Sequence, residues 1–284
     1  MSHRSCEGGA RRGPAHALQA LGAIVARELF KFSRQTGRLA SALVRPLLWL
    51  AVFGAGFRGI SGLGATPPYA QAVAYDVYLV PGLVGMVLLF NGMQSSLSMV
   101  YDREMGLMRL LLTTPLPRPW LLFSKLCATA LLSLLQALAF VVLALLLGTE
   151  LPVFSLAGLH ALLATIAGAL MLGALGLLLS VHIKQLENFA GTMNFVIFPM
   201  YFMSTALYPL ARLQESGPVW LHQAALLNPF THAVEWVRFA LYGQDAGASP
   251  WVVMACLAVF FTLAAWGYDP QRGFGQLGKR SSGA

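Results

Sequence analysis

The sequence predicts an all-α integral membrane protein with six transmembrane helices, an N-terminal interfacial helix, and short outer-leaflet helices between the fifth and sixth spans. Of the 284 residues, 57% are hydrophobic and 11% are charged, and the mean hydropathy is +0.66. Soluble domains carry about 25% charged residues, so this composition excludes a soluble globular fold. The apolar residues also gather in runs of about 20, the length with which a helix crosses roughly 30 Å of hydrocarbon.

The distribution of positive charge sets the expected topology. The six predicted spans are residues 39–57, 78–99, 123–147, 156–180, 190–208 and 251–267. If the N-terminus is cytoplasmic, 15 of the 19 Lys and Arg residues fall in cytoplasmic segments and three in outer segments. This excess follows the positive-inside rule. We therefore expect both termini in the cytoplasm, and we interpret the net charge of +8 as a topology signal rather than as nucleic-acid binding.

The chain before the first span is expected to hold a tail and a surface helix. We expect residues 1–17 to form a disordered cytoplasmic tail, because their first 15 residues are rich in Gly, Arg and Ser. They do not fit a cleavable signal peptide, because no apolar region follows them. Residues 18–38 divide into an apolar and a cationic stripe at helical spacing, a pattern typical of a helix lying in the membrane interface. The stripes are Leu18, Leu21, Val25, Leu29 and Phe32, and Arg27, Lys31, Arg34 and Arg38.

One charge lies within the first predicted span. Arg45 could be a functional cation inside the membrane, since charges there are costly. We interpret it instead as a side chain that snorkels to the cytoplasmic headgroups, because it lies only about 9 Å along the span at the rise of a helix.

The second span carries a polar face. Its polar residues recur at i, i+3, i+4 and i+7 and are Asn91, Gln94, Ser95 and Ser98. The third span repeats the pattern weakly with Thr129, Ser133 and Gln136. Lipid would penalise these groups, so they face a neighbouring helix or a water-filled path. Two interpretations stay open, namely hydrogen bonding between helices and the lining of a transport path by Asn91, Gln94, Ser95, Ser98 and Gln136.

A polar island at residues 100–119 separates the second and third spans. Its charges must lie in water at a membrane face, and they are Asp102, Arg103, Glu104 and Arg109. We expect Asp102 to cap a short helix, Glu104 to lie at its positive end, and Pro115 to stop it. Met105, Met108 and Leu112 would share one face of that helix. Such a helix is either a surface connector or a docking element for a partner.

The outer segment between the fifth and sixth spans, residues 209–250, is too polar to cross the membrane and too apolar for a free loop. Asn228 and Pro229 fit a helix start and Gly243 fits its end. We expect Val234, Val237 and Leu241 to face lipid or protein, and His232, Glu235 and Arg238 to face water. Residues 218–243 are interpreted as an outer gate whose main residues are Asn228, Pro229, Glu235 and Arg238.

Residues 102–115, followed by Arg118 and Lys125, resemble the first cytoplasmic loop of ABC-2 type permeases, the membrane subunits of ATP-binding-cassette exporters. Residues 228–243 look like that family's Asn-Pro…Arg…Gly segment, and the resemblance extends over residues 18–268, leaving 269–284 as a second cytoplasmic tail. The amino-acid sequence of residues 90–105 and 185–191 looks closest to permeases that accompany bacterial quinoprotein alcohol-dehydrogenase systems. The family often has a second acidic residue where this chain has Met108.

The resemblance implies a permease subunit in the bacterial inner membrane that exports a small organic, lipid-like or glycoside substrate. It implies a separate ATPase subunit, which binds ATP and Mg²⁺, and a second permease copy in a homodimer. It also implies that the loop docks on the ATPase through Asp102, Arg103, Glu104, Met105, Met108 and Arg109.

No catalytic site or cofactor is expected in this chain itself. Residues 273–279 fit the start of a P-loop, but Arg280 stands where the Ser or Thr that binds Mg²⁺ is required. His222, His232 and Glu235 lack a further well-placed zinc ligand. The rival interpretation is a stand-alone ion-coupled carrier or an intramembrane enzyme. Either would need acidic or His side chains at mid-depth, and the six predicted spans contain no Asp or Glu.

Overall fold

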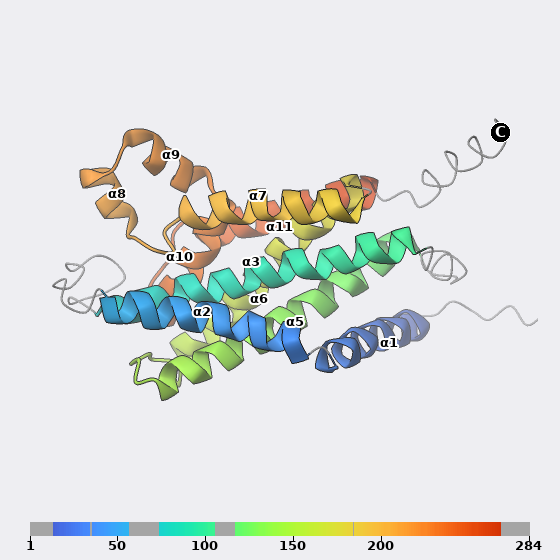
Figure 1. Ribbon diagram of the computed structural model, residues 1–284, viewed down its shortest axis with the longest axis horizontal. Helices are drawn as coiled ribbons and strands as arrows, with labels where there is room; N and C mark the ends of the chain where they lie inside the picture. Colours follow the sequence, from blue (N-terminus) through green and yellow to red (C-terminus); the bar gives the residue numbers. More distant parts are fainter. Residues whose placement is uncertain (1–13, 35, 57–73, 106–116, 184, 268–284) are drawn as a thin grey trace, which may run out of the picture.

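The computed structural model describes residues 14–34, 36–56, 74–105, 117–183 and 185–267, and all regular secondary structure within these ranges is helical (Figure 1). The helices are α1 (Pro14–Ser33), α2 (Thr36–Gly56), α3 (Tyr75–Glu104), α5 (Arg118–Leu146), α6 (Leu156–His182), α7 (Leu186–Phe202), α8 (Leu210–Ser216), α9 (Val219–Leu227), α10 (Pro229–Leu241) and α11 (Ser249–Gly267). The predicted tail at 269–284 lies outside the described residues.

Four helical stretches of the described chain are long and apolar enough to cross a membrane: Tyr75–Asp102, Pro119–Leu146, Leu156–His182 and Ser249–Gly267. They correspond to the second, third, fourth and sixth predicted spans. For the first, α2 contains a shorter apolar stretch, Ala40–Gly54, and for the fifth, α7 has 17 residues. The all-α membrane fold is confirmed, and the number of six crossings stays a prediction.

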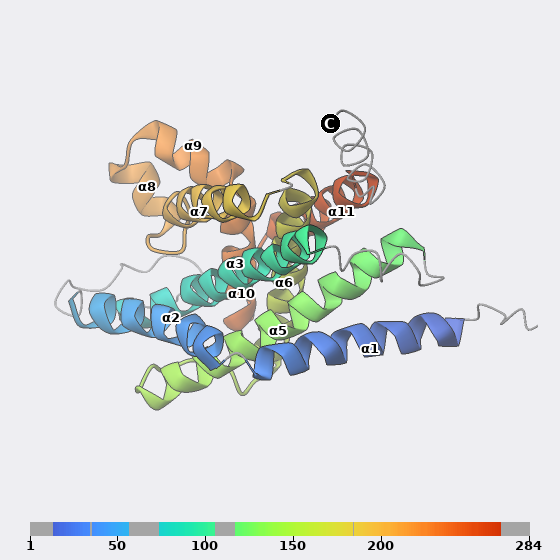
Figure 2. The same ribbon diagram turned by 45° about the vertical axis from the view of Figure 1, so that its right-hand side comes forward.

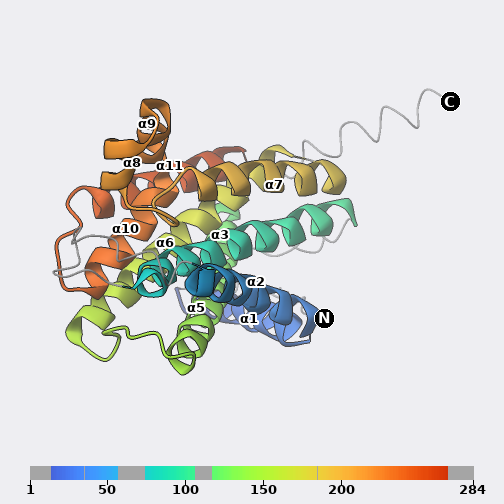
Figure 3. The same cartoon turned by 60° about the vertical axis from the view of Figure 1, so that its left-hand side comes forward.

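Helix α3 forms the centre of the bundle. It packs against α2, α5, α6, α7 and α10. Figures 1 and 3 show it between α7 on one side and α2 on the other. Its side chains are buried over most of its length, which includes Leu79, Leu83, Leu89 and Met93. A polar group on α3 therefore meets protein rather than lipid on most sides.

Glycine allows α3 and α6 to cross closely. A Cβ at Gly92 of α3 would lie 3.0 Å from the carbonyl oxygen of Leu172, and a Cβ at Gly176 of α6 would lie 2.7 Å from the carbonyl oxygen of Gly92. No side chain fits in either place. The two backbones are consequently in direct contact, as small residues permit in membrane helix pairs.

Helix α1 lies outside the bundle, alongside α5 (Figure 2). It begins at Pro14 and ends at Ser33, whereas the sequence predicted 18–38. The expected division of its surface is present, because Leu21, Val25, Leu29 and Phe32 are partly buried while Arg27, Lys31 and Arg34 are exposed. The chain turns after Ser33 and enters α2 at Thr36, which removes Arg38 from the surface helix.

The fifth predicted span, 190–208, is wrong at its outer end, because α7 stops at Phe202. The reason lies 25 residues further along the chain. The Asn228 side-chain amide donates hydrogen bonds to the carbonyl oxygens of Met200 and Met203, at 2.7 and 2.8 Å. These carbonyls would otherwise need helical partners, so Asn228 supplies the helix end that the sequence of α7 does not.

Candidate functional site

The end of α3 that leads into residues 106–116 carries the acidic side chains of the proposed docking loop. Helix α3 continues without interruption to Glu104. The prediction that Asp102 caps a new helix is therefore wrong, because Asp102 and Glu104 lie in the last turn of α3. The side chain of Arg103 and residues Met108 and Arg109 lie outside what the structure describes, whereas Met105 is described and 57% exposed.

Asp102 ties α3 to α5. Its carboxylate lies 3.2 Å from the ammonium group of Lys125, and both side chains are nearly buried. Burial of either charge alone would be strongly unfavourable, so each requires the other. The pair fixes the C-terminal end of α3 against the N-terminal part of α5.

Glu104 ties α3 to α7. Its Oε1 accepts a hydrogen bond of 2.8 Å from the backbone N–H of Leu186, the first residue of α7. A carboxylate in this place satisfies a free N–H and meets the positive end of the helix dipole. The sequence analysis expected Glu104 at a helix N-terminus. The structure shows that this N-terminus belongs to α7, 82 residues further along.

A third contact joins α1 to the same end of the bundle. The indole N–H of Trp120, in the first turn of α5, donates to the backbone carbonyl of Ala17 at 3.1 Å. Helices α1, α3, α5 and α7 are thus connected by polar contacts on both sides of residues 106–116. A displacement of this segment has direct routes into four helices.

The polar face of α3 lies against α5. Asn91 Nδ2 donates to Ser133 Oγ at 2.9 Å, and Ser95 Oγ lies 2.7 Å from Thr129 Oγ1. Ser98 donates to the carbonyl of Ser95 in its own helix, at 2.6 Å. For Asn91 and Ser95, the structure thus shows hydrogen bonding between helices, the first of the two interpretations of this polar face.

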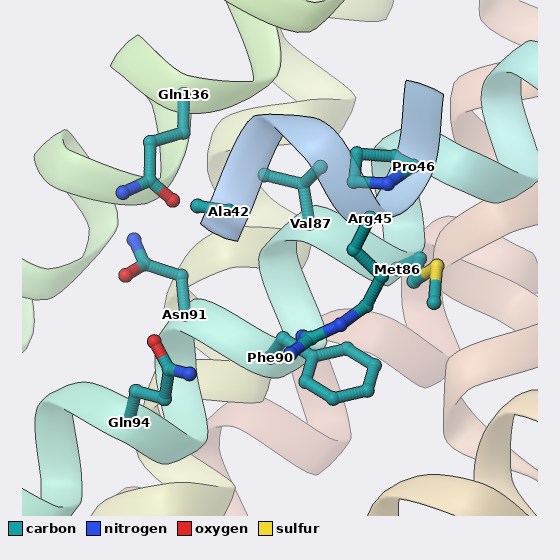
Figure 4. A pocket seen from close by; sticks show the side chains of 9 residues that line it. All are labelled: Ala42, Arg45, Pro46, Met86, Val87, Phe90, Asn91, Gln94 and Gln136. Carbon is teal, nitrogen blue, oxygen red and sulfur yellow. The ribbon is translucent and has the colours of Figure 1, made fainter. Parts of the chain in front are cut away.

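Gln94 and Gln136 line a pocket, in contrast to the bonded pairs formed by Asn91 and Ser95. Together with Arg45 and Asn91 they line a small pocket between α2, α3 and α5 (Figure 4). Gln136 is 2% exposed, and neither polar atom of its side chain has a hydrogen-bond partner. Arg45 places its guanidinium carbon 3.9 Å from the centre of the Phe90 ring, near the middle of α3. The sequence did not associate Arg45 with this polar face, because nothing in the spacing shows which side of α3 meets α2.

Within the outer segment, helix α10 begins and ends where the sequence predicted. Asn228 is the N-cap of α10, with its Oδ1 accepting from the Phe230 N–H at 3.0 Å, and Pro229 is the first helical residue. Gly243 follows the helix with φ +66°, a conformation that favours glycine. Val234, Val237 and Leu241 are buried against protein. The predicted start and stop of this helix are confirmed.

The expectation that Arg238 faces water is wrong. Its side chain is 1% exposed, forms an ion pair with Glu235, and donates to the carbonyl oxygen of Thr205 at 2.9 Å. The guanidinium carbon also lies 4.0 Å from the ring centre of Tyr78, whose hydroxyl donates to the same carbonyl. The turn after α7 leaves that carbonyl without a helical partner, and Arg238 meets it together with an aromatic face.

A larger, apolar cavity of about 620 Å³, open to the surface, lies between α3, α5, α6 and α10. Its walls include Val84, Val141, Leu159 and Val237. Thr165 also lines it, but its hydroxyl donates to the carbonyl of Ala161 in the same helix. The cavity suits an aliphatic group, and its size falls within the usual range of ligand sites.

Within the described ranges, no group of three or more His, Cys, Asp or Glu side chains could hold a metal ion. His232 instead contacts the carbonyl of Leu226 and the hydroxyl of Ser249, at 2.9 and 3.2 Å. It connects the end of α9 to the start of α11.

The chain is similar to membrane permeases of transporters over most of its length. Residues 19–242 match the family model described as ABC-2 type transporter. The putative transport permease ycf38 of Porphyra purpurea is 30% identical over 236 residues, covering 80% of this chain and 76% of its own. The protein of the same name in Cyanophora paradoxa is 32% identical over 237 residues, covering 81% and 76%. The daunorubicin resistance ABC transporter permease protein DrrB1 of Streptomyces coeruleorubidus is 25% identical over 259 residues, covering 90% and 88%.

Proposed function

Because the chain belongs to the ABC-2 type transporter family, and so is a membrane subunit of an ABC transporter, we propose that it forms the path of an ATP-driven exporter whose ATPase is a separate subunit. The family match over residues 19–242 is the observation that carries the proposal, since it spans most of α1 and continues through α10, with the contacts of Asp102, Glu104, Asn228 and Arg238. ATP and Mg²⁺ would bind to the partner and not to this chain.

In this proposal the ATPase docks on the segment that begins at the end of α3. The docking residues are Asp102, Arg103, Glu104, Met105, Met108 and Arg109. Closure of two ATPase subunits on ATP moves this segment, and a rigid-body displacement follows wherever it is firmly attached. The Glu104–Leu186 hydrogen bond and the Asp102–Lys125 pair supply such attachments, to α7 and α5.

The outer end of the path is assigned to α9 and α10. Asn228 joins the end of α7 to the start of α10, and Arg238 joins α10 to α3 through Tyr78. An outer gate made of Asn228, Pro229, Glu235 and Arg238 would thus move with α3 and α7, the two helices that also meet the docking segment. This arrangement gives the cytoplasmic signal a continuous route to the outer end.

The proposed cargo is a small organic, lipid-like or glycoside molecule moved outward across a bacterial inner membrane, with both termini of the chain in the cytoplasm. The apolar cavity supports a cargo with an aliphatic part. One relative is named for daunorubicin resistance, which supports an organic cargo and the outward direction. A homodimer is proposed because two identical subunits around a two-fold axis are the commonest closed assembly among soluble homo-oligomers.

The docking assignment is tested by replacing Met105 and Met108 with Asp. A carboxylate buried at an apolar contact costs several kcal/mol, so the ATPase should no longer co-purify with the chain from its native host. The double variant should still insert, as measured by its amount in the membrane fraction. Replacement of Gln223, an exposed polar residue on α9, by Asp serves as the control.

Two results would contradict the proposal. Stoichiometric co-purification of the ATPase with the double variant would show that this segment is not the docking site. Transport by the purified chain alone in vesicles, driven by an ion gradient without ATP, would favour the stand-alone carrier.

A further inference from the structure

The pocket of Arg45 and Gln136 is built from three helices whose residues lie far apart in the chain. Arg45 and Pro46 come from α2, Phe90, Asn91 and Gln94 from α3, and Gln136 from α5. Figure 4 shows the amide groups of Asn91, Gln94 and Gln136 pointing toward one another across the pocket. No acidic side chain lines it.

Gln136 has hydrogen-bonding capacity that the described residues do not use. Its Nε2 and Oε1 are both buried without a partner in the described part of the chain, although an amide removed from water normally finds one. Neighbouring polar residues on α5 differ in this respect, since Ser133 bonds to Asn91 and Thr129 contacts Ser95. The free amide of Gln136 points into the pocket and therefore indicates a ligand that the amide can bind.

Among the described residues, Arg45 has no acidic partner that neutralises its charge. None of the ion pairs formed by the described residues includes Arg45, whose contact is with the face of Phe90. Phe90 lies near the middle of α3, a helix long enough to cross the membrane. A cation at that depth is costly unless a counter-charge reaches it, and intramembrane charges typically mark ligand sites.

We propose that this pocket binds the anionic head group of an amphiphile, such as a phosphate, carboxylate or sulfate group. Arg45 supplies the counter-charge, and Gln136 donates a hydrogen bond from Nε2. Charge-assisted hydrogen bonds to oxyanions are the strong class of such contacts. Beside the pocket, α2 presents Val44, Leu48 and Val52, each at least 50% exposed, and these provide an apolar surface for the attached chain.

The pocket as it stands is small. Its free space measures about 10 Å³, which is room for about one water molecule and not for a head group. Pro46 lies in α2 at the pocket itself and removes one backbone hydrogen bond of that helix. Helices bend at such places, so α2 can swing away from α3 and α5 about Pro46 and open the site.

Binding at this pocket can be measured without ATP and without an ATPase, so its outcome is independent of the proposed export function. The purified full-length chain in a neutral maltoside detergent is titrated with phosphatidylglycerol or with phosphatidylcholine of the same acyl chains, and retained lipid is counted by native mass spectrometry. A further arm uses inorganic phosphate alone, which distinguishes a free anion from the head group of a lipid.

We expect phosphatidylglycerol to bind more tightly than phosphatidylcholine, and the preference to fall about tenfold in R45Q and in Q136L. Q136E keeps the shape of the side chain and should lower binding further through repulsion. R212Q removes an exposed cation of α8 and should leave the preference unchanged. Binding of inorganic phosphate with the same dependence on Arg45 and Gln136 would support the site with a free anion as its ligand.

The proposal fails if phosphatidylglycerol and phosphatidylcholine bind equally, or if R45Q and Q136L retain the wild-type preference. Thermal unfolding of each variant is measured alongside. Q136L removes a buried amide without a partner, so its melting temperature should not fall. A large decrease together with unchanged lipid preference would assign Gln136 to packing and would also overturn the proposal.

Discussion

Arg238 holds together three segments that the sequence separates: α10, the turn after α7, and the start of α3. Its contacts are Glu235, the carbonyl of Thr205 and the ring of Tyr78. Replacing Arg238 by Met keeps the aliphatic stem and removes the charge, which leaves Glu235 without its ion-pair partner and the Thr205 carbonyl with the Tyr78 hydroxyl alone. We expect the free energy of unfolding to fall by about 3–5 kcal/mol, as measured by denaturant unfolding of the purified chain.

The matched control is the exposed pair Arg212–Glu215, at 3.8 Å with side chains 53% and 65% exposed. R212Q should change the stability by less than about 0.5 kcal/mol. Combining R238M with E235Q should restore part of the loss, because the carboxylate left by R238M is then neutral. An equal loss in R212Q and R238M would contradict the central position of Arg238.

At this scale the sequence predicted what depends on neighbours in the chain. The Asn228–Pro229 start of α10 follows from local capping preferences and is confirmed. The burial of Arg238 does not follow, because a Glu and an Arg three residues apart resemble a solvated helix face. The deciding partner, the Thr205 carbonyl, is 33 residues away in a turn that the hydropathy pattern assigns to a helix.

Among the elements, the contact between α3 and α7 has a measurable consequence. Glu104→Ala removes the acceptor for the Leu186 N–H, so the first turn of α7 should fray. Loss of an N-terminal cap costs about 0.5–2 kcal/mol, so amide exchange in that turn should accelerate about 2- to 30-fold. Hydrogen exchange with mass spectrometry reads this directly.

Glu104→Gln keeps a carbonyl acceptor and loses only the charge, and its effect should be smaller. Glu150→Ala, in the loop between α5 and α6, is a control that should leave the first turn of α7 unchanged. If amide exchange in the first turn of α7 is the same in E104A as in the unmodified chain, the docking segment is not coupled to α7 through Glu104.

The element boundaries show where sequence reasoning ends. Hydropathy located the second, third, fourth and sixth spans because their apolar runs are long and flanked by polar residues. It could not show that α3 continues through Asp102 to Glu104, because charged residues within a helix are tolerated where the helix leaves the membrane. In this last turn of α3, Lys125 neutralises the charge of Asp102.

For the whole molecule, the expected topology can be tested by labelling. Single cysteines at positions 61 and 216, in a chain without its native cysteines, should react with a membrane-impermeant thiol reagent in intact cells, and one at position 106 should not. The expectation rests on the placement of 15 of the 19 cations on one side. Labelling at position 106 alone would invert the topology and place the docking segment outside.

The early end of α7 has a consequence for the surrounding lipid. A helix of 17 residues rises about 25 Å, less than the roughly 30 Å of hydrocarbon in an average bilayer. Beside this short helix, α9 exposes Val219, Trp220 and Leu227. Hydrophobic mismatch is relieved when the bilayer thins or when such side chains sink into the missing depth. With α7 as the predicted fifth crossing, we therefore expect the protein to be sensitive to acyl-chain length, and lipids of shorter chain to hold α7 and α9 with the least deformation of the membrane.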